Sequence, residues 1–227
     1  MPDLQDAGLR TRKKAKRRRG ILQVAGALFN ENGFDSTTMA EIAEAADVSP
    51  PTVFNYFGSK ENILSALIFE GTERERIQHM AQPRTYGVPF AKILGNLLCE
   101  MSENTMRIAG KRVWRYAEST NIRRANTDFQ RRFAESDQAL VDLIRGYLED
   151  YDLRLRSGEP ANRDFLARVI FDRWTARYLE FIKDDAMGLQ AHLGAVRADA
   201  EALVRLLFED DFAQCATPAK PETDLRK

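Results

Sequence analysis

Residues 38–57 read TMAEIAEAADVSPPTVFNYF, a stretch that predicts two short helices joined by a tight turn. The first helix opens with Thr38 and has Glu41 three residues later, which is the spacing of a capping box. Asp47 lies in the turn, where the chain would reverse through a positive φ that Asp tolerates better than most residues. Ser49 is a typical N-cap for the second helix, and Pro50 fits its first position because that N–H needs no partner within the helix. The stretch therefore predicts a helix-turn-helix.

Helices are also predicted on both sides of this stretch. Before it, apolar residues recur with the spacing of one amphipathic helix face up to Gly33: Ile21, Val24, Ala25, Leu28 and Phe29. After it, Gly58 closes the unit, and a further helix starts at Lys60 and continues into polar residues. We expect residues 20–66 to form a small domain whose last helix leads into the rest of the chain.

A basic run precedes this domain. Residues 10–19 hold eight basic residues and no acid, although the whole chain has 34 basic and 34 acidic residues. The remainder, with 26 basic and 34 acidic residues, is net acidic and should repel a polyanion except at one face. Such a run is usually a solvated tail. Its position nevertheless favours a basic flexible arm over residues 1–19 that contacts phosphates through Arg17, Arg18 and Arg19.

Several short motifs occur over this part of the chain with a recognisable spacing: Phe29 to Phe34, Thr37-Thr38-Met39, Ile42-Ala43, Ala46 to Ser49, Thr52 to Phe57, and Ser59-Lys60-Glu61. Through these residues, the chain from about residue 17 to residue 66 resembles the TetR family of transcriptional regulators. The family usually has Gly where Asp47 stands, and often a Lys-Gly or similar pair where Pro50-Pro51 stand. The two prolines stiffen the front of the second helix and remove two donors, so its preferred bases could be unusual.

A helix-turn-helix places the start of its second helix against base edges in the major groove. Side chains at that start and on the same face are therefore the base-reading candidates, and the resemblance gives contact roles to Asn55 and Tyr56. Phosphates are expected at the starts of the second and fourth helices, where backbone N–H groups attract anions. Beyond the three arginines of the arm, the candidate DNA-binding residues are Thr37, Thr38, Ser49, Pro50, Pro51, Thr52, Asn55, Tyr56 and Lys60.

Residues 67–215 contain further helical periodicity and no strand alternation, so the predicted fold class is all-α. Periodic segments run near 90–107, 110–118, 125–156, 161–184 and 189–215, and residues 216–227 are predicted to be a disordered tail. The resemblance implies that 67–215 form an effector-binding and dimerisation domain, in which a small molecule shifts the DNA-binding heads through the fourth helix. The identity of that effector is unknown.

Two sets of apolar residues are candidates for these roles, although ordinary core packing is the simpler explanation of each residue. Aromatic and Met side chains of the middle helices could line an effector pocket: Leu98, Met101, Met106, Trp114, Phe133, Tyr147, Trp174 and Tyr178. The last two long helices have more apolar residues than one buried face needs, and the resemblance implies a four-helix dimer bundle there. The interface candidates are Phe165, Val169, Phe181, Leu193, Val196, Leu203 and Leu207.

Other classes of protein receive little support from the sequence. No apolar run could span a membrane and no secretory signal is present, so a cytoplasmic location is expected. Cys99 and Cys215 lack metal-ligand spacing and are expected to be reduced core residues, while His79 and His192 are expected at the surface or beside helices. No phosphate-binding loop or nucleophile elbow occurs, so we expect no enzyme, no cofactor and no metal.

The sequence therefore predicts a homodimeric, sequence-specific DNA-binding regulator. We expect a repressor that a small-molecule effector releases from an inverted-repeat operator. The alternative is a dimeric helical small-molecule-binding protein with a weakened DNA head, since Pro50-Pro51 could spoil the base contacts.

Overall fold

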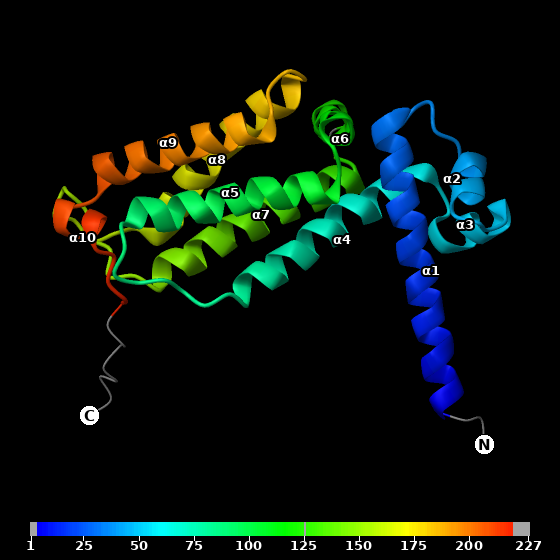
Figure 1. Cartoon of the computed structure of the whole chain (residues 1–227), viewed down its shortest axis with the longest axis horizontal. Coiled ribbons are helices and arrows are strands. Elements are labelled where there is room, and N and C mark those ends of the chain that lie inside the picture. The colour runs from blue at the N-terminus through cyan, green and yellow to red at the C-terminus, as the bar shows by residue number, and fades with distance from the viewer. Residues whose placement is uncertain (1–3, 125, 220–227) are drawn as a thin grey trace. The chain divides into compact units, whose positions relative to one another are not determined.

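A computed structural model describes residues 4–124 and 126–219, with side chains from residue 11 onward. Over these residues the chain is all-α, as predicted, and only two isolated bridges, between Tyr151 and Pro218 and between Leu155 and Phe208, resemble strand pairing. Within residues 4–124 and 126–219, none of the helices is long and apolar enough to cross a membrane. The helices, labelled in Figure 1, are α1 (Leu4–Glu31), α2 (Met39–Ala45), α3 (Pro50–Phe57), α4 (Lys60–Met80), α5 (Phe90–Ile108), α6 (Lys111–Arg123), α7 (Asp128–Glu149), α8 (Arg163–Lys183), α9 (Leu189–Leu207) and α10 (Asp210–Gln214).

These helices form two compact units. The first contains the chain up to residue 73 together with residues 105–133, and the second contains residues 74–104 and the chain from residue 134 onward. Helix α4 begins in the first unit and ends in the second. The predicted domain boundary near residue 66 did not anticipate that residues 105–133 would pack with the N-terminal part, because the partners that hold them there are remote in sequence.

The first unit has a core between α1, α2 and α3. Ile21 and Phe29 of α1, Ile42 of α2 and Val53 of α3 are all at most 1% exposed. The predicted turn chemistry is confirmed, since Asp47 has a φ of 51° and Pro50 lies in the first turn of α3. The helix-turn-helix is therefore present as the sequence indicated.

Helix α6 is held against the C-terminal end of α1. Gly110 allows this approach as it stands, because a Cβ there would lie 2.0 Å from Oδ1 of Asn30 and the Asn30 side chain would have to move. Close to this contact, Arg112 Nη1 donates to the carbonyl oxygen of Glu31 at 2.7 Å. The ring of Tyr116 stacks on that of Phe34, with centroids 4.2 Å apart. These contacts connect residues 105–133 to the loop that precedes the helix-turn-helix.

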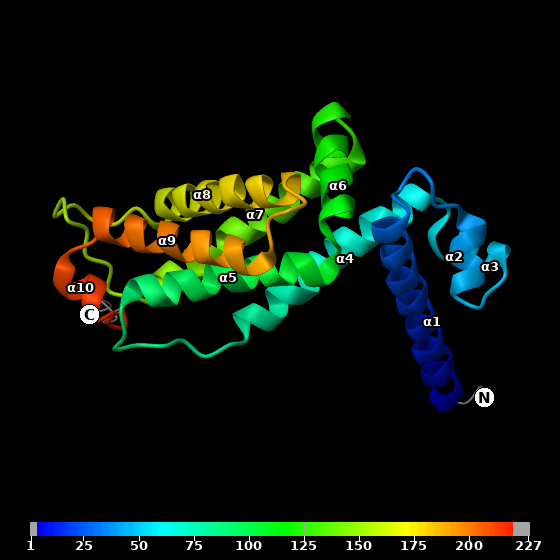
Figure 2. The same ribbon diagram turned by 45° about the horizontal axis from the view of Figure 1, so that its top comes forward.

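In the second unit, α5, α8 and α9 run side by side (Figure 2) and share a buried polar network. Trp174 Nε1 donates to Ser102 Oγ at 2.9 Å and to the carbonyl oxygen of Leu98 at 3.1 Å. His192 Nε2 lies 2.9 Å from the same Ser102 Oγ, and its ring stacks on Phe181. His192 is 1% exposed, so the prediction of a surface or flanking histidine is wrong.

The end of the described chain is ordered by backbone pairing. Ala216 N donates to Val88 O at 3.0 Å, and Asp152 N donates to Thr217 O at 3.0 Å. The predicted disordered tail is therefore wrong for residues 216–219, while residues 220–227 lie outside the described part of the chain. Cys215 is exposed, contrary to its prediction as a core residue, whereas Cys99 is buried.

Candidate DNA-binding surface and effector cavity

Helix α3 presents one face to solvent and the other to the core. Val53 and Phe57, which are four residues apart and so share one side of the helix, point inward and are 0% and 7% exposed. On the outer face, the predicted base-reading residues lie together: Ser49, Pro50, Pro51 and Asn55 are exposed, and Thr52 and Tyr56 are half-buried. The structure therefore brings this part of the predicted site onto a single surface.

The first helix of the motif is fixed by the predicted capping box. Thr38 N donates to Glu41 Oε2 at 2.7 Å, and Glu41 N donates to Thr38 Oγ1 at 3.2 Å. The hydrogen bonds from the Thr38 backbone and hydroxyl lower the pKa of the Glu41 carboxyl. Thr38 is exposed at the start of α2, but its N–H and its hydroxyl both donate to Glu41 Oε2, so the predicted phosphate contact of this residue lacks a free donor.

Two predicted DNA contacts serve the fold instead. Thr37 is 0% exposed, and its Oγ1 donates to the carbonyl oxygen of Gly33 at 2.8 Å, so its side chain is unavailable to DNA. Lys60 Nζ donates to the carbonyl oxygens of Phe34, Asp35 and Thr37 at 2.7, 3.2 and 2.8 Å, which uses all three N–H groups of the ammonium. The first-turn lysine therefore holds the loop before α2.

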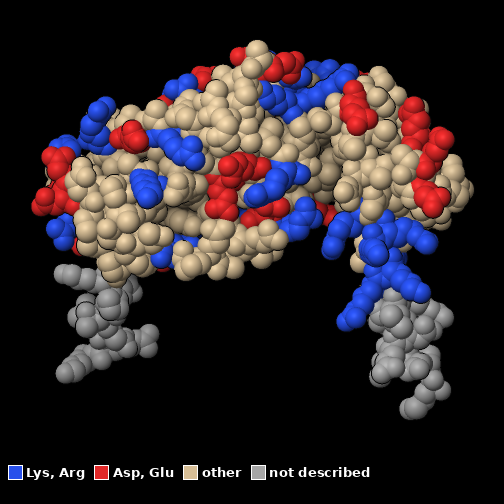
Figure 3. Space-filling model, viewed as in Figure 1, with Lys and Arg blue, Asp and Glu red and all other residues tan. Residues whose placement is uncertain are grey.

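The basic run is helical in the structure, because α1 extends from Leu4 through the arginines to Glu31. The predicted flexible arm is thus wrong for residues 4–19, and residues 1–3 lie outside the described part. Figure 3 shows Lys and Arg side chains gathered on this segment of α1. Arg17 and Arg19 are exposed.

Arg18 differs from its neighbours because it has partners within the first unit. Its Nη1 and Nη2 donate to the two carboxylate oxygens of Glu70 at 2.5 and 2.6 Å. Its guanidinium also lies 5.0 Å from the centroid of the Phe57 ring. The hydrogen bonds to Glu70 raise the pKa of Arg18. Arg18 therefore anchors α1 to α4, and the phosphate contacts expected of the run fall to Arg17 and Arg19.

Phe54 is a surface residue of α3 that sequence reasoning did not select. Its side chain is 50% exposed, although it is one of the largest apolar groups of the helix-turn-helix. It follows Pro50 by four residues, so the two share one side of the helix. This spacing could have identified Phe54 as a surface residue, because Val53 and Phe57 occupy the centre of the inner face and Phe54 lies to one side of them.

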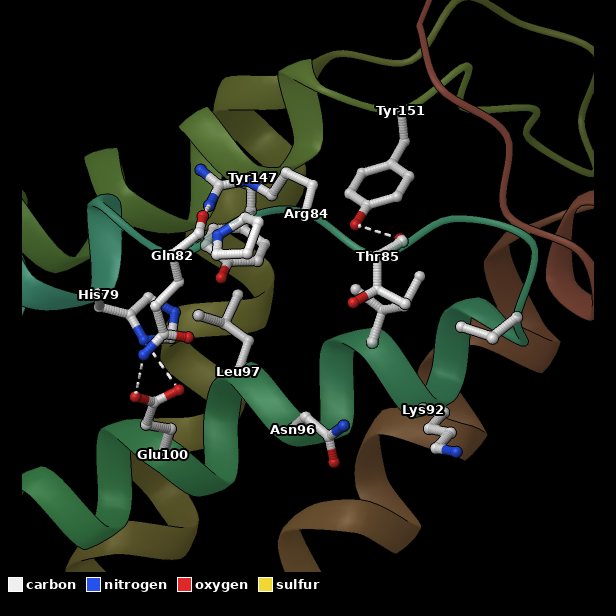
Figure 4. A pocket seen from close by; sticks show the side chains of 13 residues that line it. His79, Gln82, Arg84, Thr85, Lys92, Asn96, Leu97, Glu100, Tyr147 and Tyr151 are labelled. Carbon is white, nitrogen blue, oxygen red and sulfur yellow. Dashed lines mark hydrogen bonds and ion pairs between the residues drawn. The ribbon is translucent and has the colours of Figure 1, made fainter.

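The second unit contains a cavity of about 290 Å³ between the end of α4, the following loop, α5 and α7 (Figure 4). Its lining is mostly polar: His79, Gln82, Pro83, Arg84, Thr85, Val88, Lys92, Ile93, Asn96, Leu97, Glu100, Tyr147 and Tyr151. His79 is 2% exposed, contrary to the prediction of a surface or helix-flanking histidine, and its Nδ1 lies 3.0 Å from Glu100 Oε2. Gln82 Nε2 donates to the other oxygen of Glu100 at 2.7 Å.

The α4–α5 loop is held over this cavity by further polar contacts. Arg84 Nε donates to Asp150 Oδ2 at 2.7 Å, and its guanidinium lies 3.7 Å from the ring centroid of Tyr147. Tyr151 donates its hydroxyl proton to the carbonyl oxygen of Thr85 at 2.9 Å, and burial raises the pKa of this tyrosine to about 12. Tyr151 therefore stays protonated at neutral pH and keeps this hydrogen bond.

Of the eight predicted pocket residues, Tyr147 lines this cavity. Met106 is half-buried, and six side chains are buried: Leu98, Met101, Trp114, Phe133, Trp174 and Tyr178. Sequence reasoning missed the polar lining, because it selected apolar and aromatic side chains, whereas the lining is formed by loop residues 82–85 and by polar residues of α5 such as Asn96 and Glu100.

The predicted interface residues differ in how exposed they are. Phe181, Leu193 and Val196 are at most 2% exposed, so they pack inside one protomer and their prediction as interface residues is wrong. Phe165 is 65% exposed, and Leu206, which was not predicted, is 71% exposed. The remaining candidates are half-buried: Val169, Leu203 and Leu207.

Comparison with known proteins agrees with this arrangement. Residues 21–67 match the family described as bacterial regulatory proteins, tetR family. The transcriptional repressor KstR of Mycolicibacterium smegmatis is 26% identical over 79% of this chain and 83% of its own length. Among solved structures, Salmonella enterica GusR superposes with a TM-score of 0.59 at 20% identity, over 84% of this chain and 96% of GusR. Thermus thermophilus FadR, a repressor in complex with lauroyl-CoA, gives a TM-score of 0.51 at 22% identity, over 83% and 93% of the two chains.

Proposed function

This chain belongs to the TetR family of bacterial regulators, and we propose that it is a homodimeric repressor. We propose that it binds an inverted-repeat operator and is released from it by a small molecule. The observation that carries the DNA-binding part is the exposed face of α3. The outer residues of α3 lie opposite an inner face that is buried through Val53 and Phe57. The exposed basic residues of α1 belong to the same unit. Base contacts would come from α3, and α1 would contact phosphates.

Dimerisation is supported by apolar side chains that remain exposed on the last two long helices. Phe165 on α8 and Leu206 on α9 are more than half exposed, and α8 packs against α9. A large apolar residue at such exposure is a typical feature of a contact surface when others lie near it. We assign the interface to Phe165, Val169, Leu203, Leu206 and Leu207, and a twofold axis there would pair two reading helices on one operator.

Release by an effector is assigned to the cavity at the end of α4. The repressor FadR was solved with lauroyl-CoA, which shows that a structural neighbour binds an acyl ligand. Here the cavity of about 290 Å³ is at the small end of ligand pockets and has a polar lining, so we propose a compact, hydrogen-bonding effector. Because His79 lies near the end of α4, a ligand that separates it from Glu100 would act directly on the helix that continues into the first unit.

The decisive experiment is a binding measurement with the purified full-length protein and the DNA upstream of its own gene. Specific binding that weakens as salt rises, with a footprint of two symmetric half-sites, would support the regulator. The double variant Pro51→Ala, Asn55→Ala should lose the footprint, whereas Ile122→Ala, which removes an exposed side chain of α6, should keep it. Salt-sensitive binding without sequence preference would instead support the alternative of a weakened DNA head.

A further inference from the structure

The exposed face of α3 offers few hydrogen-bond donors. Pro50 and Pro51 occupy the first two helical positions, where other residues would present free N–H groups. The next amide, of Thr52, donates to the carbonyl oxygen of Ser49 at 2.9 Å. The backbone at the front of this helix therefore has no N–H left for a base or a phosphate over its first three residues.

The two hydroxyl groups at the front of α3 are also bonded to each other. Ser49 Oγ lies 2.9 Å from Thr52 Oγ1. Because one hydroxyl proton is shared within this pair, only the other can be donated to DNA. The polar groups that remain on the outer face for DNA recognition are the amide of Asn55, one turn further along, and the hydroxyl of the half-buried Tyr56.

Apolar groups, in contrast, are plentiful on the same face. Pro50 and Pro51 are exposed, and the Phe54 ring is 50% exposed. The ring lies on the side of α3 that carries Pro50, and Pro51 lies between that side and Asn55, as the helical rotation of about 100° per residue requires. This apolar strip, defined by Pro50, Pro51 and Phe54, has no polar side chain within it.

The major groove presents one apolar group, the C5-methyl of thymine, and Phe is among the side chains that contact it. We propose that the apolar strip makes α3 a reader of thymine methyl groups, with Phe54 and Pro51 as the specificity-determining residues and Asn55 as the adenine-reading residue. This inference rests on the proposed function, because it requires that α3 enters the groove. The exposed Lys and Arg residues of α1, in the same unit, supply the charge that draws this surface to DNA (Figure 3).

The test begins with selection of preferred sites from random duplex DNA by the full-length protein. Each thymine of the selected half-site is then replaced by deoxyuridine, which removes the methyl group and keeps base pairing. Burial of one methyl-sized group is worth about a fourfold change in affinity, so each contacted thymine should cost about fourfold. Replacement of thymines outside the half-sites is the matched DNA control and should have no effect.

Protein variants assign the effect to a residue. Phe54→Ala should bind the thymine-containing site more weakly and should lose the deoxyuridine effect at the position that Phe54 contacts. Phe54→Leu, which keeps a smaller apolar group and a good helix former, should retain part of the effect. Ile122→Ala removes a side chain that is 77% exposed in the same unit and should behave as wild type.

The outcomes separate this inference from the proposed function. Specific binding with affinity that is indifferent to deoxyuridine at every half-site position overturns methyl reading while leaving the regulator intact. Equal deoxyuridine sensitivity in the wild type and in Phe54→Ala overturns the assignment to Phe54. Failure to select any preferred sequence refutes the proposed function itself, and methyl reading with it.

Discussion

Lys60 provides the sharpest test of the structural interpretation, because sequence reasoning made it a phosphate contact and the structure makes it a loop anchor. Its Nζ donates to the carbonyl oxygens of Phe34, Asp35 and Thr37 and lies 4.6 Å from the centroid of the Phe34 ring. Lys60→Met keeps most of the stem length and removes these polar contacts. We therefore expect the variant to lose stability.

The expected loss follows from the surroundings of each bond. Hydrogen bonds to charged groups contribute about 1.5–3 kcal/mol each, and the lower end applies to the part-buried bonds to Phe34 and Thr37. The bond to Asp35 is exposed, and water replaces it at little cost. Loss of the contact with the Phe34 ring adds about 0.5 kcal/mol to the destabilisation. The variant has no ammonium to desolvate on folding, which reduces the destabilisation by about 1 kcal/mol. The free energy of unfolding should fall by about 2.5 kcal/mol, which lowers Tm by about 7 °C.

The assay is thermal unfolding followed by circular dichroism, together with operator affinity measured at several salt concentrations. Lys14→Met, which alters an exposed lysine of α1, is the matched control and should leave Tm unchanged. Operator affinity of Lys60→Met should fall in proportion to misfolded protein, with the same salt dependence as wild type. An unchanged Tm combined with a shallower salt dependence would refute the anchor and restore the phosphate contact.

Three further predictions concern other parts of the chain. Burial raises the pKa of Asp137 to about 6, against the opposing effect of Arg168, so its contribution to stability is complete below about pH 4 and is lost as pH rises through 6. Asp137→Asn should therefore increase the free energy of unfolding by about 2 kcal/mol at pH 7 in urea titrations, and a variant no more stable than wild type would contradict this. Replacing Arg17 and Arg19 with Gln removes four side chains from a dimer and should reduce the slope of log affinity against log salt by about 3.6, and an unchanged slope would remove these side chains from DNA binding. Leu206→Glu should give a folded monomer in analytical ultracentrifugation, whereas a persisting dimer would place the interface elsewhere.

The functional-site predictions failed where long-range contacts occupy a side chain. Arg18, Thr37 and Lys60 were suitable in type for DNA contacts, yet each is bonded within the first unit. Arg18 pairs with a carboxylate 52 residues away, and Lys60 bonds a carbonyl 23 residues away. Periodicity cannot reveal such partners, so a free cation and an anchored one look alike in sequence.

The apolar stripes of α8 and α9 show the same limit. Helical spacing identified Phe181, Leu193 and Phe165 as apolar stripe positions, but the first two are buried within the protomer and the third is 65% exposed. Which side of a stripe is covered depends on neighbouring helices, and spacing carries no information about them. The cavity was missed for a related reason, since its polar lining combines the α4–α5 loop with residues of α5 and α7, and only folding brings α7 against that loop.

By itself, the sequence determined the helix-turn-helix. Its capping box, its turn at Asp47 and its proline at the start of α3 depend on residues within a few positions of one another, so local chemistry is sufficient to specify them. Only the tertiary structure decided which charges are free for DNA, which apolar groups remain uncovered on α3 and α8, and where a cavity opens. Those properties depend on partners brought together by folding from distant parts of the chain.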